Sequence, residues 1–506
     1  MFTSINSFGL FGINAFPVQV EMEISSGLPE FNIVGLGDAA VKESKDRIRA
    51  AVRSSGHMFP TKKITVNLAP ADVKKTGSIC DLAIAAALFF LTGEISGDLR
   101  DCAFIGECSL GGDIHPVKGV LPMALLARKT GIKKLFVPAE NAFEASVAEG
   151  LNVYGVHSVR ELIAHFCGSP IKRQEQFVPS PKKQSDVLDF ADVKGHIIVK
   201  KALEFAAAGG HNLLMIGPPG SGKSMLAKRI PTILPPLTFD ESIDITNIYS
   251  AAGSVDRKNP LVTERPFRSP HHNTSTAGLI GGGNVPQPGD ISLSHRGVLF
   301  LDELPEFQRN TLEALRQPLE DNAVTISRSG GKVTYPCSFM LVAAMNPCPC
   351  GVFGSRVKKC TCNPASIRKY LSKISGPLLD RFDIHIEVGE VDYDKLSSAK
   401  KEESSADIRA RVTKAREIQR KRFEGTNINC NAKITENILR EVCRLTPEAD
   451  KTLRDAFEKM GLSARAHERI LKVARTIADI DGEEVIGKPH ISRAVQFRSL
   501  DRKYWQ

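Results

Sequence analysis

The stretch from Gly217 to Ser224 constrains this chain more than any other part of its sequence. It reads Gly-Pro-Pro-Gly-Ser-Gly-Lys-Ser and matches the phosphate-binding loop pattern at every fixed position. The short apolar run Leu213–Ile216 precedes it and suits a buried strand. After it, Met225–Ile230 continues as a helix that we expect to stop at Pro231. Strand, loop and helix in this order indicate a parallel α/β sheet.

Each residue type in this loop has an expected task. The glycines let successive backbone N–H groups turn toward phosphate oxygens, at a helix N-terminus that already favours anions. We expect the ammonium of Lys223 to neutralise the β and γ phosphates, and the hydroxyl of Ser224 to hold magnesium. ATP and Mg²⁺ are therefore the expected ligands, and the residues expected to bind them here are Gly217, Pro218, Pro219, Gly220, Ser221, Gly222, Lys223 and Ser224.

Two further buried-strand patterns end in polar residues that suit the same site. Val298–Leu301 is followed at once by Asp302 and Glu303. A carboxylate at the end of a strand reaches magnesium through water, so we assign Asp302 to the metal and Glu303 to polarising the attacking water. The alternative is an acidic pair that opens a helix.

The other strand pattern, Phe339–Met345, ends in Asn346. Its amide is expected to hydrogen-bond the γ-phosphate and to orient the water. The alternative is an Asn-Pro turn without a catalytic role.

The order of these motifs resembles the AAA+ ATPases, and more closely the ComM/YifB family of magnesium-chelatase-like AAA+ ATPases, in the helix-2-insert clade. The resemblance covers nearly the whole chain. It implies an ATP-hydrolysing homo-hexameric ring with ATP bound between subunits. It also implies that Arg381 is an arginine finger delivered from a neighbour and that Arg465 is the second sensor. The matching stretches are Leu28–Gly37, Phe267–His272, Gly297–Leu304, Ala343–Gly351, Gly376–Asp383 and Ser463–His467.

Composition and this resemblance together predict an α/β chain of several domains. The first, residues 1–166, is expected to resemble the proteolytic domain of Lon protease, of the ribosomal-protein-S5-like superfamily. A polar, proline-containing linker follows over 167–188. The AAA+ core is expected over 189–395, with a helix-2 insert and a pre-sensor hairpin. A helical lid, of the magnesium-chelatase C-terminal type, is expected over 396–506.

The Lon-like domain is expected to be catalytically degenerate. Alignment with the serine motif of Lon puts Ile79 at the nucleophile position, and Leu121 and Met123 fall where Lon has its lysines. A serine protease of this kind needs a serine activated by a lysine. The alternative is Ser78 acting with a displaced lysine, Lys74 or Lys75.

Four cysteines gather in one short segment, as Cys348-Pro-Cys350 and Cys360-Thr-Cys362. Two close pairs with a loop between them suit a tetrahedral zinc site, and the alternative is loop cysteines without metal. The remaining cysteines show no such pairing and are expected to be buried or inert. They are Cys80, Cys102, Cys108, Cys167, Cys337, Cys430 and Cys443.

The charge balance is compatible with DNA as a partner. Lys plus Arg is 67 and Asp plus Glu is 57, a net charge of +10, which also fits nucleotides or a solvated basic face. By resemblance, the long stretch 250–295 contains an insertion that faces the pore, and 324–335 forms the pre-sensor hairpin. The expected contacts to single-stranded or branched DNA, without sequence preference, are Arg268, His271, His272, Arg328 and Lys332.

Within this resemblance, the expected activity is DNA branch migration in homologous recombination and natural transformation. One alternative is a chelatase-type motor that remodels a protein partner, and another is a nucleotide-switched scaffold with little turnover. No apolar run approaches the roughly 18 residues of a membrane-spanning helix, and Met1–Gly12 does not resemble a signal peptide. The longest apolar run, Leu82–Leu91, is expected to form a buried helix. We therefore expect a cytoplasmic location without a membrane partner, and the 11 cysteines fit a reducing compartment.

Overall fold

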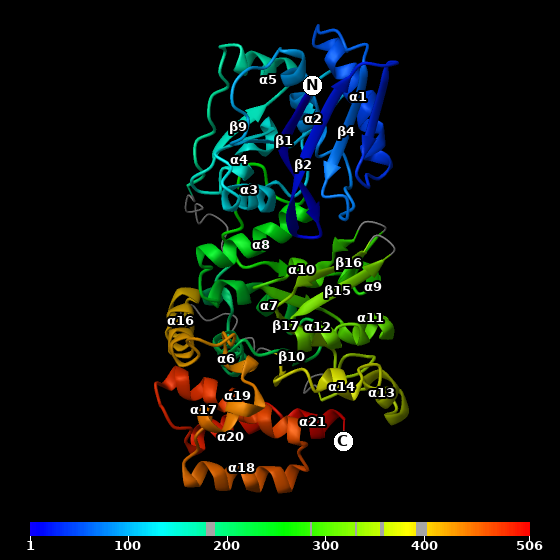
Figure 1. Ribbon diagram of the computed structural model, residues 1–506. Coiled ribbons are helices and arrows are strands. Elements are labelled where there is room, and N and C mark those ends of the chain that lie inside the picture. Colours follow the sequence, from blue (N-terminus) through cyan, green and yellow to red (C-terminus); the bar gives the residue numbers. More distant parts are fainter. Residues whose placement is uncertain (179–187, 284–285, 329–330, 355–358, 391–401, 506) are drawn as a thin grey trace. The chain divides into compact units, whose positions relative to one another are not determined.

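The computed structural model describes residues 1–178, 188–283, 286–328, 331–354, 359–390 and 402–505, apart from the side chains of Arg328, Asp501 and Arg502 (Figure 1). The chain forms two units. The first consists of Met1–Pro181 and Thr238–Thr263, and the second of Lys182–Leu237 and Glu264–Gln506. The predicted linker lies partly outside the described residues, as does the predicted boundary at residue 396.

A seven-stranded mixed sheet, in the order β3-β4-β2-β1-β5-β8-β9, forms the first unit. Its β1–β2 hairpin is antiparallel and turns at Gly12, while β5, β8 and β9 continue from β1 in parallel. The strands are β1 Phe2–Phe11, β2 Asn14–Ser25, β3 Glu30–Val34, β4 Lys63–Ala69, β5 Cys102–Phe104, β6 Glu107–Cys108, β7 Ile114–His115, β8 Lys134–Pro138 and β9 Asn152–Val156.

The longest apolar run of the chain forms α2, and every residue from Leu82 to Phe89 in this helix is buried. The expected buried helix is thus confirmed. At its start the Asp81 carboxylate is fully buried and accepts a hydrogen bond of 2.8 Å from Nε of Arg47 on α1. The helices of this unit are α1 Ala39–Ser54, α2 Asp81–Thr92, α3 Val120–Lys129, α4 Ala142–Ala145, α5 Val159–Phe166 and α8 Phe239–Ala252.

Helix α8 belongs to the first unit although it follows the phosphate loop in sequence. A capping box of Thr238 and Glu241 begins it. Near its end, the Ser250 carbonyl accepts a hydrogen bond of 3.0 Å from Gly119 N, and the Ser250 hydroxyl donates to the buried carboxylate of Glu144. α3 and α8 therefore pack together (Figure 1). The expected AAA+ core thus contributes one helix to the other unit.

Five parallel strands form the sheet of the second unit, in the order β11-β14-β17-β10-β18. The carboxyl ends lie within two residues of one another, since Ile216 lies opposite Met345, the last residue of β17, and Leu301 lies opposite Ala343. Residues that follow these strands therefore share one edge of the sheet. The strands are β10 Leu213–Ile216, β11 Phe267–Arg268, β14 Val298–Leu301, β17 Met340–Met345 and β18 Ile384–Glu387.

Two short antiparallel pairs accompany this sheet. The pre-sensor hairpin predicted from sequence is present, with β15 Ala323–Arg328 paired to β16 Gly331–Pro336. The other pair is β12 Gly281–Gly282 with β13 Gln287–Pro288.

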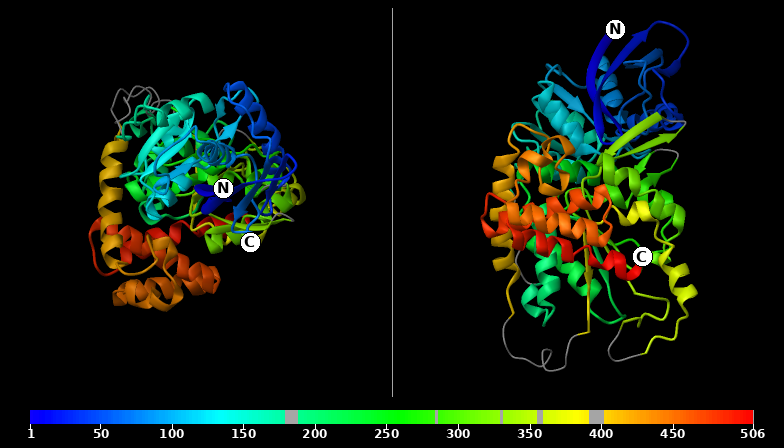
Figure 2. Two further views of the ribbon diagram at one scale, coloured as in Figure 1. Left: turned by 45° about the horizontal axis from the view of Figure 1, so that its top comes forward. Right: turned by 90° about the horizontal axis from the view of Figure 1, so that it is seen from below.

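The predicted lid helices share one hydrophobic core with this sheet. Apolar side chains of α16 and α19 join those of α6 and β10 in that core. In both views of Figure 2 the C-terminal helices lie together, as the contacts of α20 with α18 and α19 require. The helices of this unit are α6 Ile197–Gly209, α7 Lys223–Ile233, α9 Thr276–Ile280, α10 Asp290–Leu293, α11 Arg309–Glu313, α12 Arg316–Asp321, α13 Pro364–Leu371, α14 Gly376–Leu379, α16 Ser405–Arg422, α17 Glu436–Val442, α18 Pro447–Met460, α19 Ala464–Asp481, α20 Lys488–Gln496 and α21 Ser499–Tyr504.

The prediction that α7 stops at Pro231 is wrong, because the helix continues to Ile233. Proline removes a backbone donor, yet the Thr232 hydroxyl donates to the Arg229 carbonyl at 2.7 Å and stabilises the last turn. Among the described residues, no helix has both the length and the apolar character needed to cross a membrane.

We expect Arg47→Ala to destabilise the first unit by about 3 kcal/mol at pH 7, because it leaves the carboxylate of Asp81 buried without a cation. Burial raises the pKa of Asp81, with Arg47 opposing that shift, so the loss should shrink as the pH falls and the carboxylate binds a proton. Denaturant unfolding, with hydrogen exchange of α2 amides, measures both effects. Arg53→Ala, an exposed change on the same helix, should cost under about 1 kcal/mol. Equal losses for the two variants would contradict this account.

Candidate nucleotide and metal sites

The phosphate loop connects β10, which lies between β17 and the edge strand β18, to α7. Gly222 adopts φ 86° just before α7, and a Cβ at Gly217 would lie 2.2 Å from the carbonyl oxygen of Val388. These two positions therefore require glycine. The Lys223 ammonium donates to the carbonyls of Gly217 and Pro218 at 2.7 and 2.8 Å and lies 3.4 Å from Oδ1 of Asn346. Burial lowers the pKa of Lys223, and an anionic ligand would favour its charged form.

Two oxygen ligands suitable for magnesium lie together beside this loop. The Ser224 hydroxyl donates to Oδ2 of Asp302 at 2.5 Å, and Asp302 directly follows β14. Magnesium prefers one or two protein oxygens together with water and substrate phosphates. This pair therefore fits the metal, with Ser224 and Asp302 as its protein ligands.

Glu303 has a partner that the sequence did not reveal. Its backbone adopts φ 51°, a left-handed conformation that is uncommon outside glycine. Nδ1 of His272 lies 3.3 Å from Oε2 of Glu303, and the ring of His271 lies 4.1 Å from that of His272. The signal that could have indicated this is strand order, because His272 follows β11, the neighbour of β14.

The two predicted catalytic arginines lie at the other edge of the same sheet. Arg381 and Arg465 line a cavity of about 800 Å³ together with Asn212, Ser338 and Asp383, residues that precede β10, β17 and β18. The phosphate loop follows β10 at the opposite end. Four residues of strand separate the two edges, a distance of about 13 Å.

Three arginines of the cavity are paired with carboxylates. The Arg381 guanidinium, 10% exposed, pairs with Glu320 on α12, which is 55% exposed. Nη1 of Arg465 lies 3.8 Å from Oδ2 of Asp380, and Arg469 pairs with the buried carboxylate of Asp383. Burial, and next the charge of Arg469, lower the pKa of Arg381. A cavity with this many cations suits an anionic ligand.

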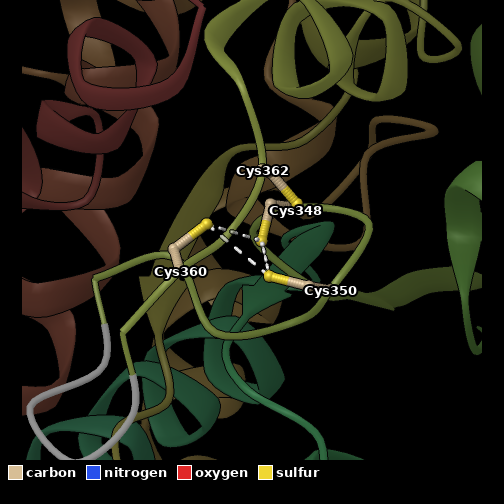
Figure 3. Close-up of side chains that lie close together, drawn as sticks. All are labelled: Cys348, Cys350, Cys360 and Cys362. Carbon is tan, nitrogen blue, oxygen red and sulfur yellow. Dashed lines mark hydrogen bonds between the residues drawn. The ribbon is translucent and has the colours of Figure 1, made fainter.

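The four clustered cysteines converge on one point directly after Asn346 (Figure 3). Their sulfur atoms all lie within 4.8 Å of one another, and Sγ of Cys348 lies 3.3 Å from that of Cys350 and 3.8 Å from that of Cys360. A tetrahedral zinc with bonds of 2.3 Å requires separations of about 3.8 Å. Backbone N–H groups of Val352 and Thr361 lower the pKa of Cys350 to about 6, which favours a thiolate. These residues fit zinc.

The cluster contacts the phosphate loop. A Cβ added at Gly351 would lie 2.8 Å from Cδ of Pro219. Among the other cysteines, which were expected to be buried or inert, Cys167 is exposed because it follows the last turn of α5, so for this residue the inert thiol stays a prediction. The expectation of burial is confirmed for the other six.

The residues predicted to contact DNA have different surroundings. Arg268 donates to Oδ1 of Asp290 from Nε and Nη2, at 2.9 and 2.6 Å, and His272 lies beside Glu303. His271 and Lys332 are exposed, and the side chain of Arg328 lies outside the described residues. His271 and Lys332 are thus the more accessible of these five positions.

The Lon-like positions contain no serine–lysine pair among the described hydrogen bonds. The Ser78 hydroxyl donates to the carboxylate of Glu107, and the Lys75 ammonium donates to the carbonyl of Pro70. Leu121 and Met123 are fully buried on α3. A carboxylate, rather than an amine, is therefore the partner of Ser78.

Comparison with known proteins places this architecture in the AAA+ class, of the magnesium-chelatase type. Three family profiles match the chain: "Magnesium chelatase, subunit ChlI" over residues 189–396, "Subunit ChlI of Mg-chelatase" over 20–141, and "Magnesium chelatase, subunit ChlI C-terminal" over 402–498. A weaker similarity, 23% over 199 residues, covers 36% of this chain and 36% of Lon protease 2 of Bacillus subtilis. The expected fold class is confirmed.

Two relatives are similar over nearly their whole length. The chain is 42% identical over 495 residues to YifB of Salmonella typhimurium, covering 97% of this chain and 96% of that protein. It is 41% identical over 503 residues to the competence protein ComM of Haemophilus influenzae, with the same coverage. The chain belongs to the ComM/YifB family of magnesium-chelatase-like AAA+ proteins.

We expect the purified chain to contain one zinc ion per subunit, bound by Cys348, Cys350, Cys360 and Cys362. Elemental analysis should show less than about a tenth of this zinc in Cys348→Ser, because three thiolates bind the ion less tightly than four. Cys167→Ser, which removes an exposed cysteine elsewhere, should keep it. When free zinc is present at 1,000 times its Kd, removing it with a chelator should lower the free energy of unfolding by about 4 kcal/mol. A wild-type chain that neither contains nor takes up zinc would contradict this assignment.

Proposed function

We propose that this protein is an ATP-hydrolysing hexameric ring motor that acts on DNA and drives branch migration in homologous recombination and natural transformation. The observation that carries the proposal is the convergence of Lys223, Ser224, Asp302, Glu303 and Asn346 at one edge of a parallel sheet. These groups are the ones that phosphoryl transfer to water requires.

Each group has one task in this proposal. Lys223 neutralises the β and γ phosphates, and magnesium, bound by Ser224 and Asp302, supplies the remaining positive charge. Glu303 polarises the attacking water, with His272 fixing the orientation of its carboxylate. The amide of Asn346, 3.4 Å from the Lys223 ammonium, bonds the γ-phosphate and orients the water.

The position of the two arginines favours an oligomer. Arg381 and Arg465 are separated from their own phosphate loop by the length of the strands, about 13 Å. A guanidinium stabilises the charge of a transferring phosphoryl group only in direct contact. The two arginines therefore act on a nucleotide held by the next subunit, a head-to-tail contact that closes into a ring.

The choice of DNA as the substrate has separate support. The chain is similar over 97% of its length to a protein named for competence, and its net charge of +10 suits a polyanion. The profile matches to the magnesium chelatase subunit favour a second candidate, a motor that remodels a protein partner. Stimulation of ATP hydrolysis by DNA separates the two candidates.

We expect the wild-type chain to convert a labelled four-way DNA junction with mobile arms into duplex products when ATP is present. Lys223→Ala should lower both ATP hydrolysis and junction conversion at least about 100-fold, because the charge on the phosphates is no longer neutralised. Lys228→Ala, on an exposed face of the same helix, is the matched control and should leave both unchanged. ATP hydrolysis by the wild type without junction conversion at low salt would exclude the DNA motor and favour the protein-remodelling candidate.

A mixture of Lys223→Ala and Arg381→Ala subunits should recover ATP hydrolysis that neither variant shows alone. In a mixed ring, an intact loop of one subunit meets an intact arginine of its neighbour at about a quarter of the interfaces. ATPase assays of equimolar mixtures measure this recovery. A mixture of Lys223→Ala with the Lys223→Ala/Arg381→Ala double variant should stay inactive. No recovery in the first mixture, with rings formed, would show that the arginine does not act across subunits.

A further inference from the structure

The guanidinium of Arg381 is held by a carboxylate that is easy to displace. Glu320 is 55% exposed and lies at the end of α12, and the pair it forms with Arg381 opens onto the 800 Å³ cavity. Nε of Arg381 is buried without a hydrogen-bond partner among the described residues. Part of the hydrogen-bonding capacity of the guanidinium is thus unused, and the carboxylate that it pairs with, Glu320, is half exposed to solvent.

The neighbouring ion pair in the cavity behaves differently. Asp383, the partner of Arg469, is buried and also accepts a hydrogen bond of 3.1 Å from Asn212 N, while Oδ2 lies 3.4 Å from Nδ1 of His211. Removing Arg469 from it would leave a buried charge, which is costly. Glu320, by contrast, returns to water when Arg381 leaves it. The Glu320–Arg381 pair is therefore the one that an incoming anion can exchange.

Glu320 is also linked directly to the pre-sensor hairpin. Helix α12 ends at Asp321, Asn322 follows with φ 53°, and β15 begins at Ala323. The Asn322 carbonyl accepts a hydrogen bond of 2.9 Å from Cys337 N, at the end of the returning strand. Both Glu320 and Asn322 line the cavity. The carboxylate that holds Arg381 therefore lies within two residues of Asn322, at the base of the β15–β16 hairpin.

We propose that the Glu320–Arg381 ion pair is a switch that couples the nucleotide of one subunit to the DNA-facing hairpin of the next. This inference rests on the proposed function. When a neighbour presents a γ-phosphate, Arg381 exchanges Glu320 for the phosphate, and the released α12 end repositions the hairpin. By linkage, DNA that holds the hairpin in its new position favours the release of Arg381 from Glu320. The freed guanidinium then contacts the phosphate and raises ATP hydrolysis. Glu320 is thus a positioning residue that acts through Arg381.

The physical basis is the difference between the two anions. An exposed carboxylate binds a guanidinium weakly, because water competes for both. A phosphoryl group carries more charge and accepts two parallel hydrogen bonds from the guanidinium. The guanidinium of Arg381 therefore binds the phosphate when a nucleotide is present. Without a nucleotide it stays paired with the carboxylate of Glu320.

The test compares Glu320→Gln with wild type and with Asp321→Asn, in full-length chains. Asp321 is the adjacent carboxylate on α12, is exposed and accepts from Gln317 at 3.1 Å, so the control removes the same charge without touching Arg381. Glu320→Gln should raise DNA-free ATP hydrolysis by about two- to fivefold, the factor by which such an ion pair shifts an equilibrium, and reduce the further stimulation by DNA. Asp321→Asn should change neither rate.

A second measurement separates a switch from a merely structural ion pair. Hydrogen exchange of β15 and β16 should change in the wild type when a non-hydrolysable ATP analogue is added. Glu320→Gln should show the changed exchange without the analogue, and Arg381→Ala should show no response to it. Glu320→Gln behaving as Asp321→Asn in both measurements would overturn the switch and leave the proposed motor intact. Wild-type hydrolysis no faster than that of Lys223→Ala would instead overturn the proposed function itself.

Discussion

The parallel pairing of β10, β14, β17 and β18 is the constraint on which the rest of the second unit depends. Parallel strands place all their carboxyl ends at one edge, where β10 ends level with β17 and β14 ends two residues before it. Lys223, Asp302 and Asn346 are far apart in sequence, yet each lies shortly after the end of a strand. Their side chains therefore lie close together beside the phosphate loop. The gathering of these groups at one edge is a consequence of the pairing.

The same pairing places a second group of residues at the edge where the strands begin, and charged side chains dominate this group. Arg381, Arg465 and Arg469 gather there, each opposite a carboxylate. Burial opposes ionisation of Asp383, yet Arg469 and His211 hold the pKa of that carboxyl well below its usual range. Positive charge thus lies at one end of the strands and the phosphate loop at the other. This polarity is what a head-to-tail ring requires.

Much of the fold was predictable because the strands are short, apolar and bounded by motifs. Leu213–Ile216 and Val298–Leu301 are strands with the predicted bounds, and the buried helix after Asp81 and the 324–335 hairpin are confirmed. The misses have tertiary causes. The helix-breaking tendency of proline predicted an end of α7 at Pro231, but the helix continues to Ile233 because a threonine hydroxyl stabilises its last turn. Helix α8 joins the first unit through the carboxylate of Glu144, a partner about a hundred residues away in sequence.

The sequence alone determined which groups this protein carries: a phosphate loop, an acidic pair and an amide at strand ends, four clustered cysteines, and the family to which these belong. It did so because each motif is local, and its chemistry follows from residue type and spacing. Only the tertiary structure decided which groups meet. It brings His272 to Glu303, Glu320 to Arg381, and both predicted arginines to the edge remote from their own loop. These contacts depend on strand order and helix packing, because both bring together residues that are far apart along the chain.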